Sequence, residues 1–154
     1  LLVNGKSLKE YQRAYVQEMA DIGCVFTLIG GSAVISDQVA NEIAEITGTA
    51  PDRVYGNNRY LTSELIAQRY ASHTDAVVLA YGQNYPDGLC GGPLAYKLHC
   101  AIMLCANNKQ KPAVRYVEGL SYEIGYILGG SGLISDETGR EVFGKEPGSL
   151  FWEK

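Results

Sequence analysis

Polar side chains that could bind a ligand gather in three short stretches of this 154-residue sequence. The stretches mix amides, hydroxyls and tyrosines with one arginine and one aspartate. Such groups form hydrogen bonds and stack on rings, but they supply few of the bases and nucleophiles on which catalysis depends. They therefore indicate binding rather than reaction. The candidate ligand-binding residues are Asn57, Asn58, Arg59, Tyr60, Thr62, Asn84, Tyr85, Asp87, Ser131 and Ser135.

Several of these residues have an alternative structural role. Arg59 and Asp87 could form an ion pair that ties two loops together, or Arg59 could grip an anionic ligand while Asp87 caps a helix. Tyr60, Tyr81 and Tyr85 could stack on sugar rings or pack as half-buried side chains. Both alternatives stay open at the level of sequence.

Common catalytic signatures are absent from the sequence. There is no G-x-S-x-G elbow, no phosphate-binding G-x-x-x-x-G-K-[ST] and no H-E-x-x-H. Cys90 and His99 fall at the two ends of a predicted helix, about 13 Å apart along its axis, which is too far for a Cys–His pair. Cys24, Cys90, Cys100 and Cys105 lack zinc-binding spacing, and we interpret them mainly as small buried hydrophobic residues. One disulfide is possible in a secreted protein. No catalytic residue, metal or cofactor is predicted.

An internal repeat defines the elements that position the polar residues. The stretch TLIGGSAVISDQV at 27–39 returns as YILGGSGLISDET at 126–138. In both copies an apolar strand, which starts at Leu1 in the first, precedes a polar loop and a helix. A second strand then ends in Gly-Gly-Ser and leads into another helix. The predicted domains are the C-terminal half of a first repeat at 1–46, a complete second repeat at 47–147, and a C-terminal tail at 148–154.

The complete repeat alternates strands with helices. Apolar strands that alternate with helices predict an α/β fold, with a parallel sheet flanked by helices on both faces. Right-handed crossovers place the loops that follow the strands at one edge of the sheet, where α/β proteins bind ligands. The predicted strands are 52–56, 76–82, 101–105 and 124–130, the helices 61–71, 86–100, 110–120 and 135–143, and the edge loops 57–60, 81–86, 106–109 and 129–135.

The two Gly-Gly-Ser turns, at 30–32 and 129–131, also permit two interpretations. Their N–H groups could face a phosphate near a helix N-terminus. They could equally be tight turns between a strand and a helix. The glycines of the predicted helix at 86–100 lower its helix propensity, so we expect them to allow close packing on the sheet.

Composition and charge narrow the function further. With 46% hydrophobic residues the chain can bury a core, and its net charge of -4 argues against a nucleic-acid partner. No apolar run reaches the roughly 18 residues of a membrane span. The sequence begins within an apolar run and has no initiator Met, so we expect a piece of a longer protein.

Four stretches in this order resemble the cell wall binding type 2 repeat of Gram-positive surface proteins. They are RVYGNNRYLT at 53–62, DGLCGGPLA at 87–95, AIML at 101–104 and ILGGSGLIS at 127–135. The sequence departs from the family pattern at Gly88 and Cys90, and it lacks the proline that usually precedes the apolar strand at 101–104.

The resemblance implies Rossmann-like or Toprim-like modules that anchor exported proteins non-covalently. The implied partner is a cell-wall polysaccharide or teichoic-acid-like anionic polymer, and the implied location is secreted, at the cell wall or cell surface. Arg59 with Lys109 or Lys111 would meet the anionic groups. Neighbouring repeats or a second chain are further partners, because a half repeat would otherwise leave a strand edge open. The alternatives are a cell-wall hydrolase or nucleotide-using enzyme on this fold, or a structural self-association module.

Overall fold

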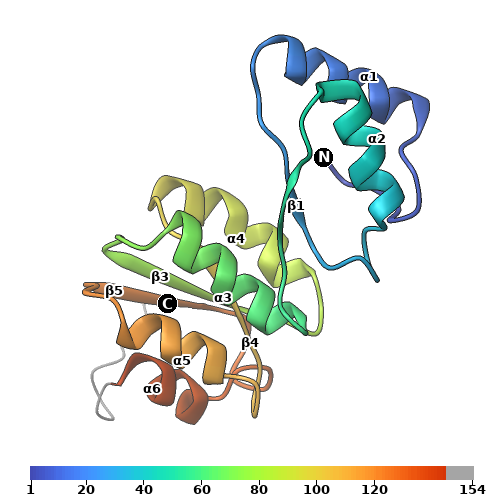
Figure 1. Cartoon of the computed structure of the whole chain (residues 1–154). Helices are drawn as coiled ribbons and strands as arrows, with labels where there is room; N and C mark the ends of the chain where they lie inside the picture. The colour runs from blue at the N-terminus through green and yellow to red at the C-terminus, as the bar shows by residue number, and fades with distance from the viewer. Residues whose placement is uncertain (145–154) are drawn as a thin grey trace. The chain divides into compact units, whose positions relative to one another are not determined.

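The chain forms two compact units, Leu1–Asn57 and a second unit that begins at Asn58. Figure 1 shows the computed structural model, which describes residues 1–144. All three strand pairings in that range are parallel, and helices alternate with the strands, which confirms the predicted α/β fold class. No helix in the described range is long and apolar enough to cross a bilayer. The predicted tail at 148–154 lies outside the described residues.

The first unit pairs two short strands in parallel and packs two helices around a small core. A positive φ of 71° at Gly48 ends its second helix in the left-handed conformation that glycine adopts without cost. The core consists of Leu8, Val16, Leu28, Val39 and Ile43. The elements are α1 (Glu10–Asp21), β1 (Thr27–Ile29), α2 (Asp37–Thr47) and β2 (Asp52–Val54).

Two features of this unit differ from the sequence predictions. The apolar run that starts at Leu1 is not a strand, and Leu2 is 93% exposed. A strand needs a hydrogen-bonded neighbour, and β1 and β2 pair only with each other in the described range. The strand at Asp52–Val54, which the repeat pattern assigns to the second repeat, lies beside β1 in the first unit.

The second unit is a three-stranded parallel sheet in the order β4-β3-β5. Its central strand is buried along Ala76–Ala80, as expected for an apolar run covered on both faces. The elements are α3 (Arg59–Tyr70), β3 (Ala76–Tyr81), α4 (Pro86–Lys97), β4 (Ile102–Cys105), α5 (Lys111–Glu118), β5 (Ile124–Leu128) and α6 (Asp136–Phe143).

Helices cover both faces of this sheet. On one face α4 approaches so closely that a Cβ at Gly91 would lie 2.5 Å from Cδ1 of Leu128. Close packing by the α4 glycines is therefore confirmed for Gly91, whereas Gly88 and Gly92 face open space. On the other face, helices α3, α5 and α6 share a core with strands β3 and β4 that includes Ala67, Val77, Leu79, Met103, Cys105, Tyr116, Val117, Val142 and Phe143.

The interpretation of the cysteines as buried residues holds for one of them. Cys105 is buried on β4 and Cys100 is half-buried, but Cys24 and Cys90 are exposed, and all four are free thiols. Cys24 follows the end of α1 rather than entering the core. Burial raises the pKa of the Cys105 thiol to about 11, so this thiol stays protonated and unreactive at neutral pH.

Candidate functional site

The loops at the C-terminal ends of β3, β4 and β5 meet the start of α3 at one edge of the second unit. We call residues 58–62, 82–87, 106–111 and 129–136 the loop rim. Arg59 Nη1 donates to the Gly82 carbonyl at 2.7 Å, and the Gly82 amide donates to the Cys105 carbonyl at 2.8 Å. The Ser135 amide donates to Asn107 Oδ1 at 3.0 Å. These bonds connect the start of α3 with the segments that follow β3, β4 and β5.

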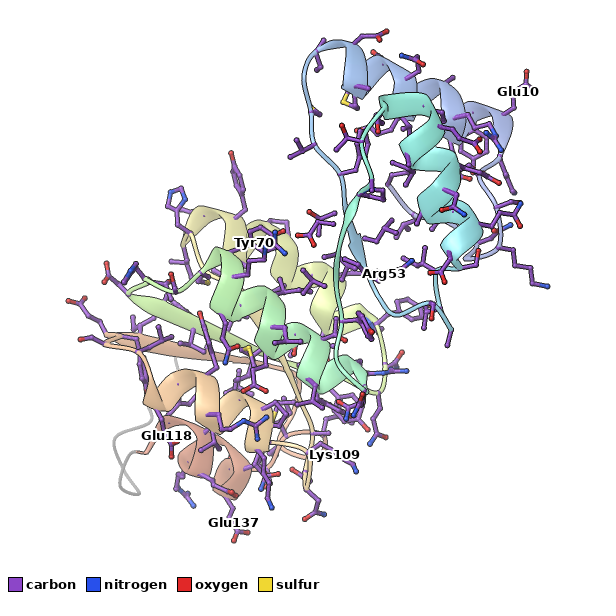
Figure 2. All side chains as sticks on the ribbon, in the orientation of Figure 1. Glu10, Arg53, Tyr70, Lys109, Glu118 and Glu137 are labelled. Atoms are coloured by element: carbon purple, nitrogen blue, oxygen red, sulfur yellow. The ribbon has the colours of Figure 1, made fainter. Side chains whose placement is uncertain are left out.

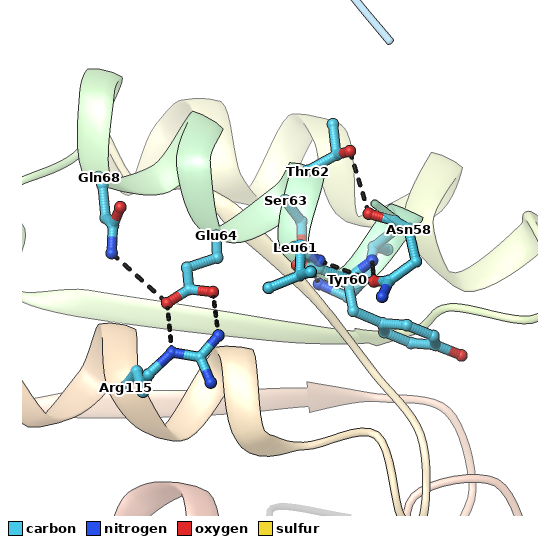
Figure 3. Close-up of polar contacts among 9 residues, drawn as sticks. Asn58, Tyr60, Leu61, Thr62, Ser63, Glu64, Gln68 and Arg115 are labelled. Carbon is cyan, nitrogen blue, oxygen red and sulfur yellow. Dashed lines mark hydrogen bonds and ion pairs between the residues drawn. The ribbon is translucent and has the colours of Figure 1, made fainter. Parts of the chain in front are cut away.

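The start of α3 is held by its own side chains (Figure 3). Asn58 Oδ1 accepts the amides of Tyr60 and Leu61, both at 3.0 Å, and so caps the helix. Thr62 Oγ1 donates to the Asn58 carbonyl at 3.1 Å. Tyr60 is buried, and a Cβ added to Gly82 would lie 2.6 Å from Cε1 of its ring. Tyr60 therefore packs in the fold rather than offering its ring to a ligand.

Arg59 and Asp87 do not form the ion pair that was one of the sequence alternatives. Arg59 is exposed and uses Nη1 on the Gly82 carbonyl, so its remaining N–H groups face solvent. Asp87 lies in the first turn of α4 and provides no side-chain cap. Its Oδ2 is instead 3.0 Å from the position that a Cβ of Gly129 would occupy. Asp87 thus lies close to the turn after β5.

The start of α6 depends on a residue that the sequence analysis missed. Ser135 Oγ caps the helix by accepting the Thr138 amide at 3.2 Å. Asn107 Oδ1, in the loop after β4, accepts both the Ser135 amide and the Thr138 hydroxyl, at 3.0 and 2.9 Å. The available signal was the Asn-Asn pair at 107–108, one residue after the predicted strand at 101–105, where loop asparagines often bind neighbouring backbone groups.

Other rim residues present their side chains to solvent. Tyr85 is 74% exposed, and its neighbour Asn84 is also exposed. Ser131, in the turn after β5, is exposed as well. Lys109 and Lys111 are exposed at the start of α5. Figure 2 shows Lys109 at one end of α5 and Glu118 at the other. These side chains, with the free N–H groups of Arg59, are the part of the rim that can meet a ligand.

Charge is distributed unevenly along the rim. Helices α3, α4, α5 and α6 all begin there, and helix N-termini carry partial positive charge. Arg59, Lys109 and Lys111 add positive charge along α3 and α5, whereas Asp87 and Asp136 add negative charge beside the end of β5. No cluster of three or more His, Cys, Asp and Glu side chains that could hold a metal occurs among residues 1–144.

The first unit contains Asn57 and the other Gly-Gly-Ser turn. Asn57 is exposed at its end. In the turn, Arg53 Nη1 donates to the carbonyls of Gly30 and Ile35 at 2.7 and 2.8 Å, and Nη2 lies 3.3 Å from Asp37 Oδ1. The turn therefore binds a guanidinium with its carbonyls, and no phosphate contact is needed to explain its glycines.

Comparisons with known proteins agree with this architecture. The family model described as Cell wall binding domain 2 (CWB2) matches residues 53–139. The amidase enhancer of Bacillus subtilis (strain 168) is 30% identical over 112 residues, which are 72% of this chain and 16% of that protein. The chain thus spans only a small part of the length of this relative.

Two solved structures share the fold. Cwp6 from Clostridium difficile superposes with a TM-score of 0.72 at 21% identity, covering 84% of this chain and 21% of its own. Cwp8 from the same organism gives a TM-score of 0.77 at 19% identity, covering 92% of this chain and 24% of its own.

Proposed function

We propose that this chain, which belongs to the Cell wall binding domain 2 (CWB2) family, anchors an exported protein to the cell wall without covalent attachment. In this proposal the chain is secreted, works at the surface of Gram-positive cells and catalyses no reaction itself. Its ligand is an anionic polymer of the wall, either an acidic polysaccharide or a teichoic-acid-like chain. Family membership supports wall binding, and the loop rim of the second unit supports the choice of polymer.

The observation that carries the proposal is the exposed basic and amide surface of the loop rim. Arg59, Lys109 and Lys111 present cationic groups, and the N-termini of four helices add to their field. Asn84 and Tyr85 offer an amide and an exposed ring, the groups that hydrogen-bond and stack on sugars. The groups that build the rim, such as the Asn58 cap, are already hydrogen-bonded within the fold.

The net charge of -4 does not oppose this local attraction. Charges at physiological ionic strength are screened over about 8 Å, so the polymer responds to the rim rather than to the whole molecule. Affinity for one module is expected to be modest, and joining several modules raises retention through effective concentration. If charged contacts bind the polymer, added salt should weaken retention of the chain on the wall.

The decisive experiment is retention on purified Gram-positive walls with and without their anionic polymer. The chain should be retained on intact walls and released when the polymer is chemically stripped. Lys109→Gln with Lys111→Gln should lower retention several-fold, because both charges are removed from the rim. The matched control is Lys97→Gln, which removes an exposed lysine from the far end of α4.

Two results would contradict the proposal. Equal retention on stripped and intact walls would exclude the anionic polymer as the ligand. A loss of retention in Lys97→Gln equal to that in the Lys109 and Lys111 variant would exclude the rim as the binding site. The supernatants of the same incubations test the alternative of a wall hydrolase on this fold. Release of soluble wall fragments that is abolished by Asp87→Asn would favour the hydrolase.

A further inference from the structure

The chain turns out of α4 at a histidine in the left-handed conformation. His99 has a φ of 51°, and its amide donates to the Tyr96 carbonyl at 3.2 Å. The next amide, that of Cys100, donates to the Ala95 carbonyl at 3.0 Å. These two bonds form a Schellman motif, in which the left-handed residue is usually glycine because a Cβ is unfavourable there. The motif fixes the backbone of His99 relative to the last turn of α4.

A glycine would adopt this backbone conformation at a lower cost. Helices α2 and α6 end in the same conformation at Gly48 and Gly144, whose φ angles are 71° and 61°. His99 is exposed, and its imidazole forms no hydrogen bond among residues 1–144. The fold therefore gains no polar contact in return for the strain. Strained residues of this kind are concentrated at functional sites, which directs attention to what the imidazole adds to the surface.

Tyr96 presents an open ring beside this histidine. Tyr96 is 83% exposed, and the centroids of the Tyr96 and His99 rings lie 6.4 Å apart, with 47° between the ring planes. A tilted pair at this distance does not cover the ring faces as a stacked pair would. Long side chains on a helix lean over the preceding turn, which here contains Gly92, and a Cβ at Gly92 would face open space. No side chain at that position therefore covers the tyrosine ring.

The chemistry of this aromatic pair matches the face of a neutral sugar ring. The face of an aromatic ring carries partial negative charge and attracts the weakly positive C–H groups on the face of a pyranose. The imidazole of His99 and the hydroxyl of Tyr96 can each donate or accept a hydrogen bond, as sugar hydroxyls require. The stretch from Leu89 to Tyr96 contains no charged residue. The pair therefore favours a neutral ring over an anionic group.

The aromatic pair is remote from the loop rim along α4. The helix begins at Pro86 in the rim, and Tyr96 follows ten residues later, which is about 15 Å along the helix axis. We propose that Tyr96 and His99 form a second binding site, which takes one neutral pyranose unit of a glycan. Tyr96 stacks on the face of the sugar, and the His99 imidazole hydrogen-bonds to a sugar hydroxyl.

This site goes beyond the proposed function, because it uses no residue of the loop rim and binds no anionic group. A single stacked sugar gives a dissociation constant on the order of 1 mM. Such a contact is too weak to hold the chain on a wall by itself. The release expected from polymer-stripped walls therefore does not depend on this site, and either proposal can fail without the other.

The test is an NMR titration of the full chain with cellotriose, a neutral trisaccharide of β-linked glucose whose hydroxyls are equatorial. The ring signals of Tyr96 and His99 should shift and saturate, with a dissociation constant on the order of 1 mM. Sorbitol has similar hydroxyl groups but no ring, and it should cause no saturable shift. Absence of a saturable shift up to about 20 mM cellotriose, or an equal response to sorbitol, would overturn the proposal.

Variants of Tyr96 test the stacking contact. Tyr96→Ala should weaken cellotriose binding about tenfold, whereas Tyr96→Phe keeps the ring face and should weaken it by no more than about threefold. Tyr11→Ala is the matched control, because Tyr11 is a tyrosine of α1 that is 64% exposed, and its removal should leave the affinity unchanged. Equal losses in Tyr96→Ala and Tyr96→Phe, or in Tyr96→Ala and Tyr11→Ala, would exclude stacking on Tyr96.

His99→Gly separates binding from folding. Glycine relieves the left-handed strain, so the urea midpoint of unfolding should rise, while the affinity for cellotriose should fall several-fold because the imidazole is lost. An affinity unchanged in His99→Gly would show that His99 has no part in the site. Lys97→Gln removes the neighbouring charge and should leave the affinity unchanged, because the ligand is neutral. A loss in Lys97→Gln equal to that in Tyr96→Ala would contradict a site for neutral sugars.

Discussion

Arg59 shows how one rim side chain can serve the fold and still be available to a ligand. Its Nη1 fixes the turn after β3 through the Gly82 carbonyl, while the rest of the planar guanidinium faces solvent. A guanidinium has five N–H donors in a rigid fork, so one bond to the backbone leaves the others oriented rather than lost. The bond to Gly82 thus holds Arg59 in place without an ion pair to Asp87.

Gly82 allows the closest contact in the rim. A Cβ at this position would lie 2.6 Å from Tyr60 Cε1 and 3.2 Å from the Leu104 Cβ, neither of which can move without repacking. We expect Gly82→Ala to lower the free energy of unfolding by about 1–3 kcal/mol, measured by urea denaturation. Gly88→Ala is the control, because its Cβ would meet open space in α4 and should raise stability by up to about 1 kcal/mol. Equal effects of the two changes would contradict this packing.

At the scale of elements, helices α3 and α5 are joined by an ion pair with two hydrogen bonds. Arg115 Nε and Nη2 contact Glu64 Oε1 and Oε2 at 2.9 and 2.6 Å, as Figure 3 shows. The Glu64 side chain is buried, whereas that of Arg115 is half-exposed. The pair therefore holds a carboxylate that would be costly to bury alone.

Removing Arg115 alone should lower the thermal stability more than removing both Arg115 and Glu64. Arg115→Met leaves Glu64 buried without its cation, so the midpoint of thermal unfolding should fall by several degrees. Glu64→Met combined with Arg115→Met should recover a large part of that loss, because both charges leave together. Lys111→Met, on the same helix and exposed, should change the midpoint little. Circular dichroism melts measure all three, and a double variant less stable than Arg115→Met would refute the argument.

At the scale of the whole molecule, the core of the second unit contains groups whose pKa values are raised by burial. Burial raises the pKa of Cys105 from 9.0 to about 11 and that of Tyr116 from 10.0 to about 12. Burial also raises the pKa of Cys100 and Tyr122. All four residues belong to the second unit, and each is neutral when protonated.

The second unit should therefore lose stability in alkali. These groups ionise more readily in the unfolded chain, so their contribution is complete below about pH 9 and is lost as pH rises through the folded-state values of about 11 and 12. Thermal unfolding between pH 7 and pH 11, followed by amide signals from each unit, measures the effect. A second unit as stable at pH 11 as at pH 7 would contradict it.

The sequence alone determined what depends on local patterns. The run at 76–82 is β3 (Ala76–Tyr81), and the helix predicted at 135–143 is α6 (Asp136–Phe143) with Ser135 as its cap. Apolar runs and capping residues act over a few neighbours, and parallel strands place their following loops at one edge. The α/β class and the gathering of the second unit's loops therefore followed from the sequence without coordinates.

Only the tertiary structure decided which groups meet across the chain. It showed that the apolar run at Leu1 pairs with no strand among residues 1–144, that β2 lies beside β1, and that Arg59 binds the Gly82 carbonyl instead of Asp87. It also placed the Tyr60 ring in the core and Asp87 beside Gly129. Strand pairing, ion pairing and burial each need a partner distant in sequence, and residue types constrain such partners only weakly. For that reason the fold class could be derived from local pattern, whereas the partners of individual polar groups could not.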